Sequence, residues 1–159
     1  MDPLLAQLPP AFWSVPYDGA RFPGSRAVTQ RPGLEPGANC QLFAYAVLRH
    51  FGLSVPDLRS SDLWTDTHAM TRVTTGRPLD LLLFNRTHEP YGAHVGVRLH
   101  DDRVLHLCAE IGRPAVWTLG DFAERERYRV LIGAKRVTRR RAPKATGPRP
   151  GTYRAAPGT

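Results

Sequence analysis

The sequence predicts an α+β fold in which helices come first and an antiparallel β-sheet follows. Residues 42–48 are apolar without interruption and lie between Asn39 and Gly52, residue types that favour the start and the end of a helix. Residues 94–99 alternate strictly between apolar side chains and polar side chains or glycine, which is typical of a strand with one face in the core. Helices followed by several strands are characteristic of the α+β class.

The length of the chain indicates the number of domains, and the distribution of charge separates a folded part from a C-terminal segment. The chain has 159 residues, enough for one domain with a sizeable core. Residues 138–159 contain six Lys or Arg and no Asp or Glu, whereas residues 1–137 contain sixteen and fourteen. The net charge of +8 is therefore mainly a property of the C-terminal segment. This segment is also rich in Pro and Gly, and we expect residues 138–159 to be a disordered basic tail.

The N-terminal part is predicted to be irregular and helical. Residues 1–36 are rich in Pro and Gly and should form an extended arm with turns and one short helix near residues 4–8. The helix that begins after Asn39 comes next, and capping signals predict one or two short helices in residues 57–64. Residues 66–78 are expected to be a loop or a weak helix.

Strands dominate the second half. The expected elements, in order, are strands at residues 79–84, 94–99, 104–109 and 115–117, a capped helical turn at 118–122, and a last strand at 128–134. They are expected to form a meander on which the helix of residues 40–51 packs. The predicted domain therefore spans residues 37–137.

Cys40 is the first candidate for chemistry. It stands in the first turn of the predicted helix, where unpaired N–H groups and the helix dipole favour a thiolate and lower its pKa. The alternative is a small buried core residue, which is the commoner role of a free cysteine. The other cysteine, Cys108, is expected to be a free thiol, because we see no export signal.

His94 and His106 are the candidate partners of Cys40. Each lies in one arm of a predicted hairpin, and a base followed by an orienting group is what a cysteine nucleophile requires. We expect the helix to pack over the face that carries His94, with Gly96 leaving room for its approach. A two-residue turn would put the two histidines on opposite faces, so this mechanism predicts an odd-numbered loop or a bulge between Leu99 and Val104.

Three segments together resemble a known family. Residues 94–106 are similar to the histidine-bearing hairpin block of the NlpC/P60 cysteine peptidases, and the spacing of the two histidines matches. Asn39-Cys40-Gln41 stands where that family has Asp-Cys-Ser before its central helix, and residues 78–84 resemble its Pro-Gly-Asp strand. The resemblance covers about residues 37–109, with the motifs in the family's order.

The resemblance implies a papain-like fold and a specific reaction. Cys40 would be the nucleophile, His94 the base and His106 the third polar residue of a Cys-His-His triad that cleaves amide bonds without a cofactor. Many members cleave cell-wall peptides. Tyr17, in a segment that partly matches an upstream family motif, is a candidate for oxyanion stabilisation, and Asn39 and Gln41 are candidates for substrate contact. Asn39 and Gln41 also depart from the family pattern, and Asn39 removes a charge that would bind an amine.

Several alternatives stay open. The four side chains of Cys40, His94, His106 and Cys108 could form a zinc site, although the chain lacks a closely spaced ligand pair. Tyr17 could be only a packing anchor. The domain could be a binding module without turnover, or an amidase or acyltransferase with a substrate unrelated to the cell wall.

The expected partner is a small peptide or amide, bound by a monomer. The first residues lack the basic and apolar regions of a secretory signal, and no apolar run is long enough for a membrane span, which predicts a cytoplasmic protein. The basic tail allows weak contact with nucleic acid, but the nearly neutral folded part does not favour nucleic acid as the main partner.

Overall fold

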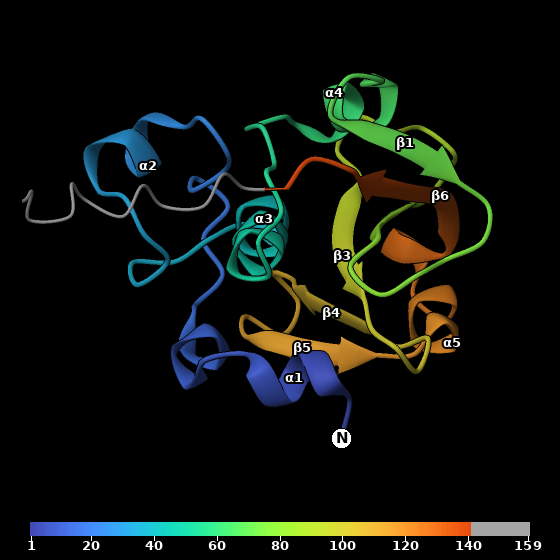
Figure 1. Ribbon diagram of the computed structural model, residues 1–159, viewed down its shortest axis with the longest axis horizontal. Coiled ribbons are helices and arrows are strands. Elements are labelled where there is room, and N and C mark those ends of the chain that lie inside the picture. The colour runs from blue at the N-terminus through green and yellow to red at the C-terminus, as the bar shows by residue number, and fades with distance from the viewer. Residues whose placement is uncertain (141–159) are drawn as a thin grey trace, which may run out of the picture.

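A computed structural model describes residues 1–140 of the chain (Figure 1). Its helical elements are α1 (Pro3–Gln7), η1 (Pro10–Ser14), α2 (Arg26–Gln30), α3 (Cys40–His50), α4 (Ser60–Thr65), α5 (Leu119–Ala123) and η2 (Glu126–Tyr128). Its strands are β1 (Met70–Val73), β2 (Leu81–Asn85), β3 (His94–Arg98), β4 (Val104–Leu107), β5 (Pro114–Trp117) and β6 (Val130–Val137). The α+β prediction is confirmed, because α3 packs on a six-stranded antiparallel sheet that follows it in the chain.

The sheet is a meander only in part. Its strand order is β1-β6-β2-β3-β4-β5, so β2 to β5 follow one another as predicted, whereas β6 inserts between β1 and β2. The prediction of a loop or weak helix at residues 66–78 is wrong where β1 forms. Residues 70–73 are too few and too polar to reveal the alternation of a strand. The strand exists because β6 offers it a partner, with Met70 opposite Val137.

Helix α3 forms as its sequence predicts. The Asn39 side-chain oxygen accepts a hydrogen bond from the backbone N–H of Leu42 at 2.8 Å, which caps the first turn. After the helix, Gly52 has a φ of +87°, a left-handed conformation that glycine adopts without strain. Most of the helix is buried, and it occupies the middle of the molecule in Figure 1.

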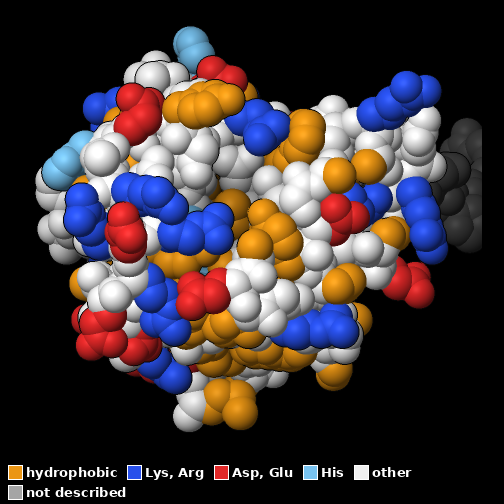
Figure 2. Space-filling view, turned by 180° about the vertical axis from the view of Figure 1, so that it is seen from behind, with side chains coloured by type: hydrophobic (Ala, Val, Ile, Leu, Met, Phe, Trp, Pro, Cys, Tyr) orange, Lys and Arg blue, Asp and Glu red, His pale blue; other side chains and the backbone are white. Residues whose placement is uncertain are grey.

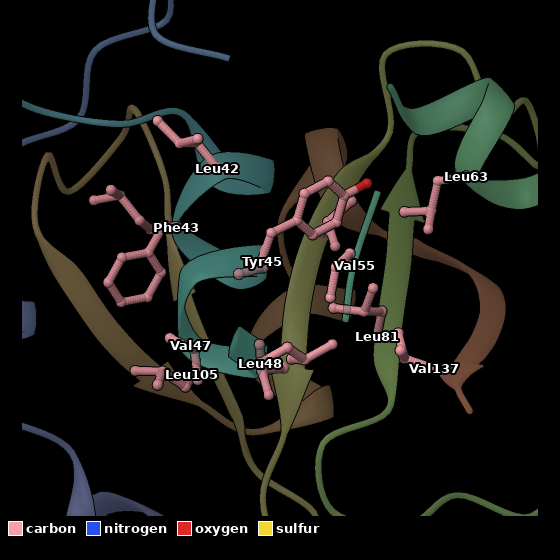
Figure 3. Packing of buried hydrophobic residues seen from close by; sticks show 14 of the residues in the cluster. Leu42, Phe43, Tyr45, Val47, Leu48, Val55, Leu63, Leu81, Leu105 and Val137 are labelled. Atoms are coloured by element: carbon pink, nitrogen blue, oxygen red, sulfur yellow. The ribbon is translucent and has the colours of Figure 1, made fainter. Parts of the chain in front are cut away.

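The main core lies between α3 and one face of the sheet. Val47 of α3 lies beside Leu105 of β4, and Tyr45 points toward Val55 and Leu63 (Figure 3). On β3, the residues that belong to this core are Val95 and its odd-numbered neighbours, as strand alternation requires. Burying these side chains contributes roughly 1.5–3 kcal/mol each to the free energy of unfolding.

A second, smaller cluster covers the opposite face of the sheet. It consists of Leu82, Phe84, Val104, Cys108, Trp117, Phe122 and Tyr128. Phe122 comes from α5, whose first turn is capped by Thr118 through a bond from the Asp121 N–H at 3.1 Å. The rings of Phe84 and Phe122 stack with centroids 4.0 Å apart. The sheet is therefore buried on both faces near its centre.

The N-terminal arm is ordered around one buried arginine. Arg21 donates hydrogen bonds to four backbone carbonyls, those of Gly37, Ala27, Arg31 and Gly33, at 2.7–3.1 Å. These bonds hold the loop that contains α2, a helix that the sequence pattern did not predict. Further along, Ala38 N donates to Pro16 O and Asp18 N donates to Ala38 O, so residues 16–18 run beside the start of α3. The arm thus brings Tyr17 to the cysteine helix.

One face of the described part is mixed in charge. Figure 2 shows Lys and Arg side chains interspersed with Asp and Glu, without one large block of either sign. None of the helices in residues 1–140 is long and apolar enough to cross a membrane. Of the predicted tail, residues 138–140 are described, and Arg139 O accepts a hydrogen bond from Ser54 N at 2.8 Å. The prediction of disorder for residues 141–159 falls outside the described residues.

Candidate active site

The predicted histidine pair forms in the structure. His94 Nε2 lies 2.9 Å from His106 Nδ1, and both side chains are buried. The strand register explains this, because Val97 pairs with Leu105 and Arg98 with Val104, so Gly96 faces His106. His94 and His106 therefore lie on the same face of the sheet.

The loop of the hairpin has the predicted odd number of residues. Leu99 N donates to Arg103 O at 2.8 Å, which leaves residues 100–102 as the loop. Asp102 at its end has a φ of +66°, the left-handed position that such three-residue loops require. The parity condition for the histidine pair is therefore confirmed.

The histidines are not on the face that we expected. His94 and His106 contact the rings of the second cluster, including Phe122 and Trp117, on the face of the sheet opposite α3. The expectation that α3 packs over the His94 face is wrong, because Val95 already occupies the helix-facing side and neighbours in a strand point in opposite directions. Gly96 does not make room for the helix. It makes room for Val104 and His106, whose atoms would lie 2.4 and 3.4 Å from a Cβ at that position.

Cys40 and His94 nevertheless line the same pocket, at the end of the sheet. Both line a pocket of about 240 Å³, together with Tyr17, Asn85, Arg86, Gly92, Ala93, Ala109, Arg127 and Tyr128. Cys40 is half-buried at the first turn of α3, and His94 is the first residue of β3. The helix start and the strand start therefore open on the same pocket from opposite sides of the sheet edge.

Burial controls the protonation of both groups. Burial raises the pKa of the Cys40 thiol to about 11, against the opposing effect of the backbone N–H groups of Val95 and Gln41. The expected lowering of this pKa by the helix start is thus outweighed in the free protein. Burial, then the charges of His106 and Arg127, hold the pKa of His94 well below its usual value. At neutral pH the site therefore holds a neutral thiol and a neutral imidazole.

The shared hydrogen bond decides where each ring keeps its proton. If His94 donates from Nε2 to His106 Nδ1, then His94 Nδ1 is free to accept a proton and His106 carries its own proton on Nε2. That Nε2 is buried without a hydrogen-bond partner in residues 1–140. Its ring lies 4.2 Å from that of Trp117 and 4.7 Å from that of Phe122, measured between centroids, and aromatic faces accept N–H groups weakly. This arrangement is the one that leaves His94 able to act as a base.

The other predicted site residues divide into two groups. Tyr17 lines the pocket, and burial followed by the nearby Cys40 raises the pKa of its hydroxyl, which therefore stays a donor at neutral pH. Asn39 is buried and uses its side-chain oxygen to cap α3. Gln41 is buried, does not line the pocket, and has an Oε1 without a partner among the described residues. Tyr17 thus joins Cys40 and His94, whereas Asn39 and Gln41 do not.

The zinc alternative finds no support in the positions of the ligands. Within residues 1–140, no three His, Cys, Asp or Glu side chains are grouped so that they could hold a metal ion. Both cysteines are free thiols.

Two arginines at the pocket were not predicted. Arg86 follows the end of β2, and Arg127 lies in η2. The strand pairs place them there, because Phe84 pairs with His94 and Asn85 with Val130. The chain after β2 and the chain before β6 must therefore lie at the His94 end of the sheet. Pairing the predicted strands β2 and β3 would have placed Arg86 at the His94 end of the sheet. The position of Arg127 could not be predicted in this way, because it depends on the unexpected insertion of β6 beside β2.

The chain has no recognisable relative in two comparisons: no protein-family model matches it, and no curated protein matches it significantly.

Proposed function

We propose that this protein is a cysteine hydrolase that cleaves amide bonds through Cys40, His94 and His106. The observation that carries the proposal is the convergence of Cys40 and His94 on one pocket, with His94 Nε2 held 2.9 Å from His106 Nδ1. A nucleophile, a base and a group that orients the base are the parts that such catalysis requires. The sequence resemblance to the NlpC/P60 peptidases and their papain-like fold supports the same assignment.

The reaction starts from the neutral pair. Nδ1 of His94 accepts the proton of the Cys40 thiol as the sulfur attacks the substrate carbonyl, and a tetrahedral oxyanion forms. The Cys40 backbone N–H and the Tyr17 hydroxyl are the candidate donors to that oxyanion. The intermediate collapses, the amine leaves with the proton from His94, and water then hydrolyses the thioester and regenerates the thiol.

The proton transfer is coupled to substrate binding in this scheme. A thiol with a pKa of about 11, in a pocket with an imidazole of lowered pKa, does not ionise in the free protein. The negative charge develops only when the carbonyl and the oxyanion donors are in place. His106 contributes by fixing the tautomer of His94 and by sharing its charge when the imidazolium forms.

Acylation by an activated ester tests this function. Wild-type protein and the variants Cys40→Ala and His94→Gln are mixed with p-nitrophenyl acetate, and the acetylated residue is located by mass spectrometry. We expect acetylation at Cys40, about 10²-fold slower acylation in His94→Gln, and none at this position in Cys40→Ala. Ester cleavage at the wild-type rate by Cys40→Ala would contradict the proposal.

A substrate screen then separates amide classes. Short peptides, cell-wall-type peptides and non-peptide amides are offered to wild-type protein, with Cys40→Ala as the control. Transfer of the acyl group to an added amine would identify an acyltransferase, and turnover of none of these would favour a binding module.

A further inference from the structure

We infer that the pocket binds a substrate with a carboxylate close to the scissile bond, and that Arg127, helped by Arg86, holds this carboxylate. The inference rests on the proposed function of Cys40 and His94 and specifies the substrate class. It starts from the composition of the pocket, which contains two guanidinium groups and no Asp or Glu.

Within residues 1–140, no acidic side chain forms an ion pair with the guanidinium group of Arg86 or Arg127. The side chain of neither donates a hydrogen bond to a described residue, and Arg127 lies 5.8 Å from the ring centroid of Tyr128. Arg127 and His94 line the same pocket, and the charge of Arg127 contributes to the lowered pKa of His94. It therefore lies close enough to act on a group bound beside His94.

Two acidic side chains that neighbour pocket residues in the chain are engaged elsewhere. Asp18, next to Tyr17, accepts a hydrogen bond from Ala20 N at 3.0 Å. Glu110 pairs with Arg125, with 3.4 Å between Oε1 and Nε. Neither lines the pocket. A bound carboxylate would thus meet two guanidinium groups in a pocket whose lining contains no carboxylate.

The backbones that carry the two arginines are held in place. The Asn85 side chain donates to the carbonyls of Glu89 and Tyr91 at 2.8 and 3.2 Å and accepts from Arg86 N at 2.9 Å. Arg127 precedes Tyr128, a buried residue whose ring lies 4.7 Å from that of His94 between centroids. Both arginines therefore extend from fixed positions at the His94 side of the pocket.

The cysteine side of the pocket also carries no negatively charged side chain. Asn39 directs its oxygen to Leu42 N and carries no charge, so this side offers no anion for a substrate amine. Guanidinium groups bind carboxylates with two charge-assisted hydrogen bonds, which makes a carboxylate the matching ligand.

Paired alkylating reagents test the inference. Iodoacetate carries a carboxylate and iodoacetamide does not, and in both cases the Cys40 sulfur displaces iodide and forms an S–C bond. The ratio of the two rates at Cys40 is measured by mass spectrometry in wild type, Arg127→Gln, Arg86→Gln and the double variant. Arg26→Gln, which removes the same charge from the exposed face of α2, is the control.

We expect Arg127→Gln to lower the iodoacetate-to-iodoacetamide ratio roughly fivefold, with a smaller effect of Arg86→Gln and no effect of Arg26→Gln. A ratio that stays the same in the double variant would overturn the inference.

A binding measurement keeps this test separate from catalysis. Cys40→Ala is titrated with N-acetylalanine, with its uncharged amide, and with an N-acetylaspartate whose α-carboxyl is amidated, and binding is followed by NMR. The inference is supported if either carboxylate binds more tightly than the uncharged amide and if this preference is lost in Arg127→Gln. The compound that binds more tightly shows whether the carboxylate belongs to the main chain or to the side chain of the substrate. If this preference holds while p-nitrophenyl acetate does not acylate Cys40, the proposed function fails and the carboxylate site stands. Equal binding of all three compounds would overturn the carboxylate site alone.

Discussion

His94 Nε2 and His106 Nδ1 lie 2.9 Å apart on a face of the sheet that is covered by aromatic rings. The three-residue loop between β3 and β4 makes this contact possible, because any even-numbered loop without a bulge would turn one ring to the opposite face. The pair is buried and neutral. This combination determines how the protein responds to acid.

Mild acid should destabilise the fold. The pKa of His106 is lowered to about 3 by burial and then by the charge of Arg125, and that of His94 is also lowered. Between the ordinary histidine pKa of about 6.5 and these values, the unfolded chain binds protons that the folded chain does not. The free energy of unfolding should therefore fall as pH drops from 6.5 to 4.5, by about 1.4 kcal/mol per pH unit for each such histidine.

Denaturant titrations at several pH values measure this slope. The His106→Asn variant should be less stable at neutral pH but should show a shallower dependence on pH. The exposed residue His88 provides the control His88→Asn, which should retain the wild-type slope. A flat profile for the wild type between pH 6.5 and 4.5 would contradict a buried, neutral pair.

The reactivity of Cys40 should follow a high thiol pKa. Because burial raises this pKa to about 11, the thiolate fraction grows about tenfold per pH unit up to that value. The rate of alkylation by iodoacetamide should therefore keep rising from pH 7 to pH 10. Cys108, which is 1% exposed, should react more slowly than Cys40 throughout, as peptide mapping can determine. A plateau at Cys40 near pH 7 would instead indicate a thiolate already stabilised in the free protein.

Gly96 should tolerate no side chain. A Cβ at this position would lie 2.4 Å from Val104 Cγ1 and 3.4 Å from His106 Cβ, so one strand must shift. We expect Gly96→Ala to reduce the free energy of unfolding by about 1–3 kcal/mol and to slow acylation of Cys40 by displacing His106.

The matched control is Gly120→Ala in the exposed first turn of α5. There a Cβ would lie 3.6 Å from Thr118 Oγ1, an ordinary contact, and alanine favours the helix. Its stability should equal or exceed that of wild type. Equal stability of both variants in thermal unfolding would argue against close packing at Gly96.

The ion pair of Asp80 with Arg136 should be important for the start of β2. Asp80 is 1% exposed, accepts bonds from Arg136 Nε at 2.8 Å and Nη2 at 2.9 Å, and also accepts from Arg77 N at 2.6 Å. Removing the carboxylate leaves a partly buried guanidinium without its partner. Asp80→Ala should reduce the free energy of unfolding by about 2–3 kcal/mol.

An exposed pair offers the comparison. Asp57 binds Arg49 at 2.9 Å but more than half of its side chain is exposed, so Asp57→Ala should change the stability by less than about 1 kcal/mol. Denaturant unfolding of the two variants at pH 7 measures both. Similar small losses would show that Asp80 is not needed to position β2.

Features that depend on neighbouring residues could be predicted from the sequence. The cap at Asn39, the end of α3 near Gly52 and the alternation in β3 follow from local hydrogen bonding and from which side chains can be buried. The requirement for an odd loop between the two histidines also follows from alternation alone. Cys40, His94 and Tyr17, three of the candidates named from the sequence, line one pocket in the structure.

The tertiary structure decided which side of the sheet each group occupies and what surrounds it. β6 inserts beside β2 through pairing across many residues, which no local pattern in residues 70–73 or 130–137 reveals. That insertion brings Arg127 to His94, and the rings of Phe122 and Trp117 remove water from the histidine pair. The pKa values of Cys40 and His94 depend on this desolvation, because the free energy of a charge is set by everything that covers it and not by its place in a helix or strand.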